Sequence, residues 1–220
     1  MHPEDMVIMT TSSEAGFYRL MSWLSPSFPV GAYSYSHGIE YAFEAGDVTD
    51  PASLQTWIEG ILAFGSGHTD GVLFRSGWQA IAEKDDELLS WAIETAATLR
   101  ATKEMALENS AQGEAFIEIL RNSWPHEGLQ KFEDLQAKLD RSASYPVAVG
   151  VAASMWGIDQ ETALSAYLHA FISNLVSAGV RMIPLGQTAG QKIITALEAD
   201  VIETVNSISQ TPITQLRSNI

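Results

Sequence analysis

Residues 159–182 of the chain read DQETALSAYLHAFISNLVSAGVRM, and this stretch decides the fold class. At about 100° of rotation per residue, its larger apolar side chains fall in one narrow stripe: Leu164, Leu168, Phe171, Leu175 and Met182. The opposite side carries a row of small residues: Ala166, Ala170, Ser173 and Ser177. A solvated surface helix would place Lys and Glu in that row, whereas small side chains let another helix backbone approach closely. We therefore expect a helix that is buried on nearly all sides.

Helical spacing of apolar residues recurs over most of the chain. The pair Asp50-Pro51 is a helix start signal, an N-cap residue followed by proline at the first helical position. Further helices are expected at 34–45, 72–83, 86–101, 103–122, 128–139, 146–156, 160–183 and 185–208. Alternating β-branched runs between hairpin turns are missing. The sequence predicts an all-α, single-domain bundle of about eight to ten helices over residues 15–220, after a flexible tail at 1–14.

Composition and charge exclude several classes of function. The 220 residues include 12 Lys and Arg against 27 Asp and Glu, a net charge of −15, and 46% are hydrophobic. Such an acidic chain repels phosphate backbones and anionic lipids, so we expect no nucleic-acid and no membrane partner. The absence of cysteine excludes a disulfide framework, a thiolate nucleophile and a Cys-based zinc site. The first residues lack the basic and apolar regions of a signal peptide, which predicts a soluble cytoplasmic protein.

One candidate for acid-base chemistry lies in residues 25–40, which read SPSFPVGAYSYSHGIE. Ser34 is suited to cap a helix that Gly46 ends. On that helix His37 and Glu40 lie three residues apart on one face and could exchange protons. The pair keeps open the alternative that the chain is a small-molecule enzyme built on a helical bundle. A partner-facing or solvated polar face is the favoured interpretation, and two such ligands are too few to hold a metal.

A glycine-rich run at residues 65–71, GSGHTDG, looks superficially like a phosphate cradle. It lacks the Gly-Lys-Ser/Thr ending through which a P-loop binds phosphate and magnesium, and no strand precedes it. We therefore interpret it as an interhelical turn.

The most informative cluster reads VRMIPLGQTAGQ over residues 180–191. Pro184 is expected to end the long helix and to open the next one. Gly186 and Gly190 are spaced for close packing.

Three polar side chains of this cluster are candidates for recognition. Gln187 and Gln191 lie four residues apart on one face, and neutral amides suit specific hydrogen bonding better than acid-base chemistry. A buried turn whose backbone groups these glutamines satisfy is an equally favoured interpretation. Arg181 lies at the C-terminal end of the long helix, where a cation is stabilised by the helix dipole, so capping and a functional role both stay open.

Four stretches of the chain resemble the urease accessory protein F (UreF) family and occur in that family's order. They read SPSFPVGAYSYSHGIE at 25–40, RATKEMALENSAQG at 100–113, YPVAVG at 145–150 and YLHAFISNLVSAGVRMIPLGQTAGQ at 167–191. The part from 181 to 191 is highly specific, and the resemblance spans residues 17 to about 200.

The resemblance implies an all-α protein that has no enzymatic activity, no catalytic residue, no cofactor and no metal site of its own. It implies a homodimer that helps to deliver nickel to apo-urease. Members of the family bridge the GTPase UreG and a second accessory protein, UreD (also called UreH), which contacts urease, and assembly is coupled to GTP hydrolysis by UreG. The positions that match the family's motifs place a partner-binding surface around seven residues: Tyr33, Ser34, His37, Glu40, Arg181, Gln187 and Gln191.

The chain departs from the family pattern in two places. Members often end in a tail with a His-Glu pair and an Arg-Leu-Phe-Arg-Ser-like finish, whereas residues 215–220 read QLRSNI. The contribution of such a tail to binding UreD is therefore in question. Lys103 and Ala106 stand where more arginine is expected, which lessens anion pairing on that helix.

Overall fold

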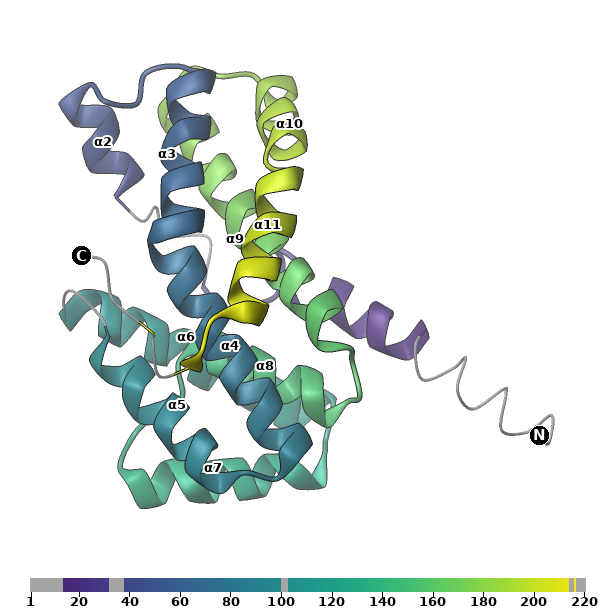
Figure 1. The fold of residues 1–220 in the computed structure, drawn as a ribbon. Coiled ribbons are helices and arrows are strands. Elements are labelled where there is room, and N and C mark those ends of the chain that lie inside the picture. The colour runs from purple at the N-terminus through teal and green to yellow at the C-terminus, as the bar shows by residue number, and fades with distance from the viewer. Residues whose placement is uncertain (1–13, 32–37, 100–102, 214–215, 217–220) are drawn as a thin grey trace. The chain divides into compact units, whose positions relative to one another are not determined.

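The computed structural model describes residues 14–31, 38–99, 103–213 and 216, and these residues form helices and no strand. Ten of the helices in these ranges are labelled in chain order (Figure 1): α2 Ile39–Ala45, α3 Pro51–Phe64, α4 Ser66–Glu83, α5 Asp86–Thr98, α6 Lys103–Ser123, α7 Glu127–Leu139, α8 Tyr145–Met155, α9 Gln160–Met182, α10 Gln187–Ala196 and α11 Glu198–Gln210. Residues 14–23 are helical as well. The predicted all-α bundle is confirmed.

The tertiary contacts gather in two compact units. Unit 1 comprises Leu73–Ala166 together with the N-terminal residues up to Val30, and unit 2 comprises Gly31–Val72 and Tyr167–Ile220. The boundary between the units falls inside α4 and inside α9. Of the predicted tail, only Glu14 belongs to the described residues. The division into a tail and one domain over 15–220 stays a prediction.

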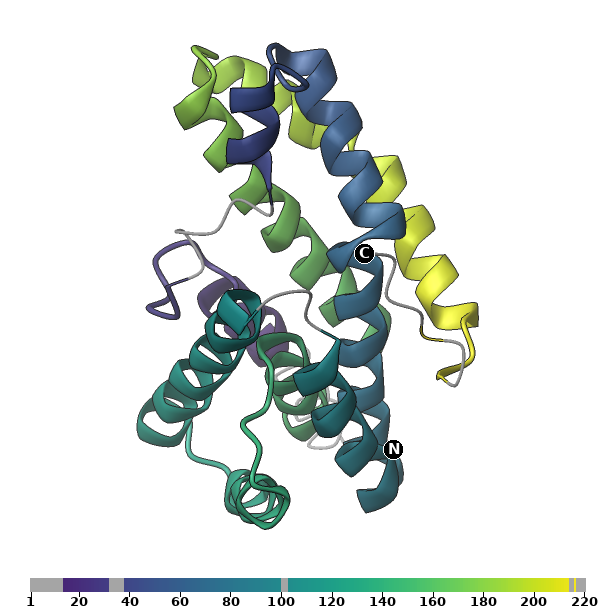
Figure 2. The same cartoon turned by 90° about the vertical axis from the view of Figure 1, so that its left-hand side faces the viewer.

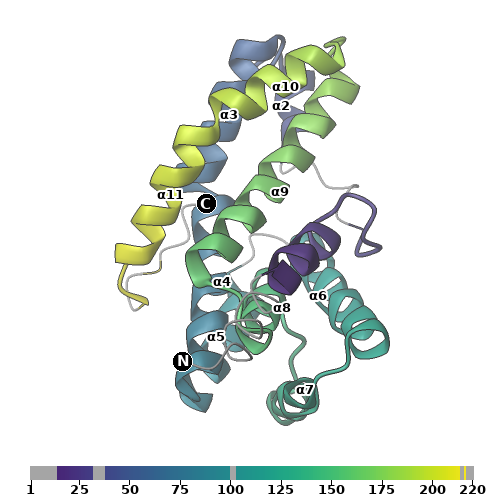
Figure 3. The same ribbon diagram turned by 90° about the vertical axis from the view of Figure 1, so that its right-hand side faces the viewer.

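Unit 1 is built around α8, which packs against α6 (Figure 3). The side chains from Pro146 to Ala153 are all buried, so this helix faces other helices on every side. Such close packing depends on two glycines. A Cβ at Gly150 would lie 2.1 Å from the carbonyl oxygen of Phe74 on α4. A Cβ at Gly113 on α6 would lie 2.1 Å from the carbonyl oxygen of Ala143, just before α8.

An aromatic cluster anchors the N-terminal helix in unit 1. Trp23 is fully buried, and its ring meets three others edge to face: Phe116 at 6.0 Å, Trp124 at 6.1 Å and Trp156 at 5.3 Å between centroids. Edge-to-face pairs place the positive ring edge over the negative ring face, which adds to the gain from burial. This cluster fixes residues 14–23 against the ends of α6 and α8.

Unit 2 is formed by α2, α3, the C-terminal part of α9, α10 and α11. The predicted start of α3 is confirmed, because the Asp50 carboxylate accepts a hydrogen bond of 2.8 Å from the Ser53 N–H, with Pro51 at the first helical position. Both α10 and α11 pack on α3, and Figure 2 shows α11 running beside it. The predicted single helix at 185–208 is wrong: α10 and α11 are separated at Leu197, and this break lets both follow α3.

The interpretation of residues 65–71 as an interhelical turn is also wrong. α4 begins at Ser66, so only Gly65 separates it from α3. A Cβ at Gly67 would lie 2.7 Å from Leu62 Cα, so a glycine is needed for α4 to start this close to α3. These glycines mark close packing of helices and not a loop.

The helix α9 is buried less completely than predicted, because the row of small residues is only partly buried: Ala166, Ala170, Ser173 and Ser177. Within α9 four residues are exposed: Glu161, Thr162, His169 and Arg181. By length and composition α9 is long and apolar enough to cross a membrane, with a mean hydropathy of 1.3. Half of that window is buried inside the structure, as in the core helix of a soluble protein.

Candidate functional site

The predicted partner-binding residues fall into two groups. Tyr33, Ser34 and His37 lie outside the described residues. The remaining four belong to unit 2, and all of their side chains are exposed: Glu40, Arg181, Gln187 and Gln191. None of the four is enclosed in the core.

Glu40 lies in the first turn of α2. This helix begins at Ile39, directly after Gly38, whose backbone is left-handed with φ of 83°. The part of the predicted helix at 34–37 lies outside the described residues, and its predicted end at Gly46 is confirmed. The acid-base alternative depends on one helical face shared by positions 37 and 40, and His37 lies outside the described residues, so this alternative stays a prediction.

Arg181 lies in the last turn of α9, beside the row of small residues. Its Nη1 donates a hydrogen bond of 2.9 Å to the Ser177 hydroxyl, one turn earlier on the same helix. Arg181 takes part in a further interaction within the chain as well. The geometry agrees with a cation at a helix C-terminus and leaves the exposed side chain able to meet a partner.

The turn after α9 differs from the prediction in two respects. Pro184 does not open the next helix, because α10 begins three residues later at Gln187. Gly186 is exposed and has no close neighbour, whereas Gly190 is buried and a Cβ there would lie 3.0 Å from Val180 Cγ2. Close packing of α10 on α9 therefore depends on Gly190 alone of the two glycines.

Gln187 and Gln191 do not satisfy a buried turn. Both side chains are exposed, and among the described residues neither side-chain amide has a hydrogen-bond partner. Their donors and acceptors face solvent on the first turns of α10. In Figures 1 and 3 the turn between α9 and α10 lies at the same end of unit 2 as the loop between α2 and α3.

The other two motif stretches have a structural explanation. The Asn109 side chain on α6 accepts a hydrogen bond of 3.0 Å from the Tyr145 N–H and so caps the start of α8. Gly113 and Gly150 permit the close helix contacts described above. Residues 100–102 lie outside the described residues. These two motif stretches therefore contain residues that hold unit 1 together.

A polar run inside α4 was not singled out from the sequence. Asp70, Arg75 and Ser76 are 5%, 4% and 0% exposed, and each takes part in an interaction within the chain. Removal from water lowers the pKa of the Arg75 guanidinium. Buried charges are tolerated only where they are paired, so this run is part of the fold. These polar residues lie beside apolar residues in the sequence, so the spacing of apolar residues alone does not predict that they are buried.

One open surface cavity of about 330 Å³ lies in unit 1, and it is lined by Glu114, Glu133, Gln136, Ala137, Asp140, Arg141 and Ser142. Two of its carboxylates are already engaged, because Glu114 accepts a hydrogen bond from Ser142 and Glu133 pairs with Arg121.

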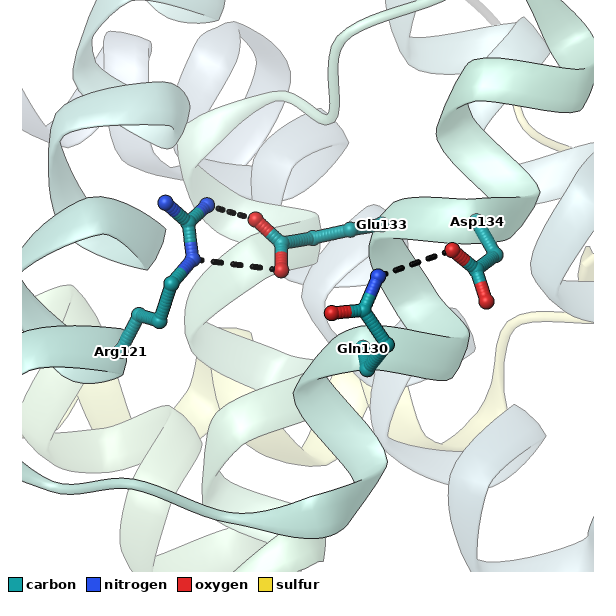
Figure 4. A network of polar contacts seen from close by, with 4 residues as sticks. All are labelled: Arg121, Gln130, Glu133 and Asp134. Atoms are coloured by element: carbon teal, nitrogen blue, oxygen red, sulfur yellow. Dashed lines mark hydrogen bonds and ion pairs between the residues drawn. The ribbon is translucent and has the colours of Figure 1, made fainter.

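Figure 4 shows that the Arg121–Glu133 pair joins α6 to α7, with Nε to Oε2 at 3.3 Å, while Gln130 donates to Asp134 one turn along α7. The described residues contain no group of three His, Asp or Glu side chains arranged to hold a metal.

Comparison of the chain with known proteins identifies its family. The UreF family model matches residues 48–198. A urease accessory protein UreF of Rhodopseudomonas palustris (strain BisB5) is 46% identical over 194 residues, which cover 88% of this chain and 79% of that protein. The protein of the same name from Magnetococcus marinus is 41% identical over 209 residues, or 95% of this chain and 89% of that protein. Since the family model and both relatives cover most of its length, the chain belongs to the UreF family of urease accessory proteins.

Proposed function

We propose that this chain is a non-catalytic maturation factor of urease that acts in the cytoplasm. It assembles as a homodimer with a UreD/UreH-type protein and a UreG-type GTPase, delivers nickel to apo-urease, and couples assembly to GTP hydrolysis by the GTPase. Nickel is the cargo of the complex in this proposal and not a resident cofactor. Apo-urease is contacted indirectly, through the UreD-type protein.

One observation carries this proposal: the most specific family motif ends in side chains that the fold does not use. Gln187 and Gln191 are exposed, and neither amide is bonded to another described residue. Arg181 is exposed as well, at the end of α9 next to the turn that leads to α10. Exposed amides and guanidinium groups give directional hydrogen bonds across a protein interface, where Arg is enriched. Recognition of a partner protein accounts for such residues better than packing does.

The test is co-purification of the full-length chain with both partners from one organism. The tagged chain is expected to form a complex with the UreD-type protein and the UreG-type GTPase, and light scattering should give two copies of the chain. The chain alone should hydrolyse neither urea nor GTP. Absence of any complex with the two partners would overturn the proposal.

A double variant tests the recognition surface itself. Gln187→Ala with Gln191→Ala should weaken the complex while leaving the unfolding midpoint unchanged. Gln210→Ala is the matched control, because this exposed glutamine at the end of α11 lies outside the family motifs. If the control weakens the complex as much as the double variant does, the motif has no special role.

Arg181 has two distinguishable roles in the proposal. As a finger in the GTPase site it would stabilise charge that develops during hydrolysis. Arg181→Ala would then leave the complex intact and change the rate of GTP hydrolysis. As a docking residue it would be needed for assembly, and the same variant would lose the complex.

A further inference from the structure

The start of α7 in unit 1 is capped by a histidine. His126 is the N-cap residue of this 13-residue helix, and its backbone is extended. Its Nδ1 accepts a hydrogen bond of 3.0 Å from the N–H of Gly128, the second residue of the helix. The first N–H groups of a helix have no partner within it, so a side-chain acceptor at this position stabilises the helix end. A ring nitrogen that accepts a hydrogen bond has no proton, so in this geometry the proton of the neutral ring is on Nε2.

Packing holds the His126 ring in this position. Its centroid lies 4.8 Å from that of the Trp156 ring at the end of α8, and the two ring planes are inclined at 48°. A Cβ at Gly128 would lie 3.0 Å from His126 Nδ1 and 3.1 Å from Cε of Met155. A larger residue at position 128 would therefore crowd the ring, whereas glycine lets it reach the backbone. The cap is thus part of the contact between the start of α7 and the end of α8.

An added proton would reverse the role of the capping nitrogen. An imidazole gains its proton between about pH 8 and pH 5, and both of its nitrogens are then donors. Protonated Nδ1 cannot accept the hydrogen bond from Gly128, so two N–H groups would face each other. The positive ring would also lie at the end of α7 where the helix dipole is positive. The Trp156 ring attracts a cation, which offsets part of this loss but does not restore the acceptor.

The charged groups around His126 do not bind its ring. Among the described residues, the His126 side chain contacts Gly128 and Trp156 and forms no ion pair. α8 carries no charged residue. The charged side chains on the other elements that pack on α7 or on Trp156 are Glu14 and Arg19 of the N-terminal helix, Asp86, Glu87 and Glu94 of α5, Glu114, Glu118 and Arg121 in the second half of α6, Glu127 and Lys131 at the start of α7, and Asp159 after α8. All of them except Arg19 are exposed, so no buried carboxylate among them favours the protonated ring.

We propose that His126 is a pH-dependent cap of α7. The neutral ring holds the first turn of α7 on the end of α8, and protonation of the ring releases that turn. The effect extends to the aromatic cluster, because Trp156 also contacts Trp23 of the N-terminal helix at 5.3 Å between centroids. Acid therefore loosens unit 1 where these three elements meet. This inference concerns the stability of unit 1 and does not depend on the proposed function.

The first experiment compares the pH dependence of urea unfolding in the full-length wild type and in His126→Asn. Asparagine is a good N-cap residue that does not titrate. The cap of the wild type is present at about pH 7.5 and is lost as the pH falls to about 5.5, because the unfolded chain then binds the proton more readily. The urea midpoint of the wild type should therefore fall more than that of the variant over this range. His169→Asn is the matched control, since His169 is exposed in the interior of α9, with its Nε2 3.4 Å from the Ser173 hydroxyl, and caps no helix end. This control should keep the pH dependence of the wild type.

The second experiment observes the cap directly in the wild type. The amide proton of Gly128 should lose about fivefold in protection against hydrogen exchange between about pH 7.5 and pH 5.5, after correction for the intrinsic exchange rate. Equal protection of Gly128 at the two pH values would overturn the proposal, and so would a His126→Asn variant that loses as much stability in acid as the wild type does. If His126→Asn does not fold, the measurement on Gly128 alone supports or overturns the proposal.

Discussion

Replacement of Gly150 by alanine tests the closest helix contact in unit 1. The new Cβ would lie 2.1 Å from the Phe74 carbonyl oxygen, whereas ordinary contact begins at 3.4 Å, so α8 and α4 must move apart by about 1.3 Å. Overpacking of a dense core costs about 1–3 kcal/mol. Because backbone and not a flexible side chain is in the way, we expect the upper end of that range. The gain of about 1 kcal/mol in helix propensity offsets only part of it.

Gly60→Ala is the matched control for this change. Gly60 lies in the interior of α3, is exposed, and would have nothing within 4 Å of its new Cβ. The same chemical change should therefore stabilise the protein by about 0.5–1 kcal/mol. Urea unfolding followed by circular dichroism measures both variants. The close approach of α8 and α4 would be refuted if Gly150→Ala had the same free energy of unfolding as the wild type. It would also be refuted if both substitutions changed the free energy of unfolding in the same direction.

Three further predictions concern stability. Trp23→Ala should cost about 3–5 kcal/mol and abolish most of the near-ultraviolet circular dichroism, because it empties the centre of the aromatic cluster. A free-energy loss well below this range in urea unfolding would contradict that placement. The backbone and side-chain hydrogen bonds of Thr162 lower the pKa of Asp159 below its unfolded value, so its stabilisation is present above about pH 4 and is lost as the pH falls further. Asp159→Ala should therefore lower the free energy of unfolding by about 1 kcal/mol at neutral pH. In acid the variant and the wild type should be equally stable, which unfolding measured at several pH values would show. A double-mutant cycle on Arg121 and Glu133 should give only about 0.2–1 kcal/mol, reduced by salt, because the arginine side chain is 54% exposed.

Local signals in the sequence predicted much of the secondary structure. Asp50-Pro51 located the start of α3, because an N-cap bond and a fixed proline φ depend only on neighbouring residues. The expected helix at 103–122 agrees with α6 to within one residue. Tertiary packing decided the features that were missed. Gly67 looked like part of a turn, but its place in α4 depends on contact with Leu62, which local reasoning does not show.

The candidate site was predictable only in part. The motif that ends in Gln187 and Gln191 identified exposed side chains, but the sequence could not decide between exposure and a buried turn. Burial of an amide depends on which helices cover it, and that is set by residues far away in the chain. Tyr41 is a similar case, since its side chain is 73% exposed while Ile39 and Ala42 on the other side of α2 are fully buried.

The aromatic cluster has a consequence for synthesis on the ribosome. Trp23 contacts Trp156, which lies 133 positions later in the chain. The N-terminal helix therefore leaves the ribosomal exit tunnel long before Trp156 has been synthesised. Until α8 has been translated, the apolar side of residues 14–23 must stay exposed to water or be shielded by a chaperone. Long-range contacts of this kind slow folding, because a large loop must close before they form. Unit 1 therefore cannot complete its core until Trp156 has emerged from the ribosome.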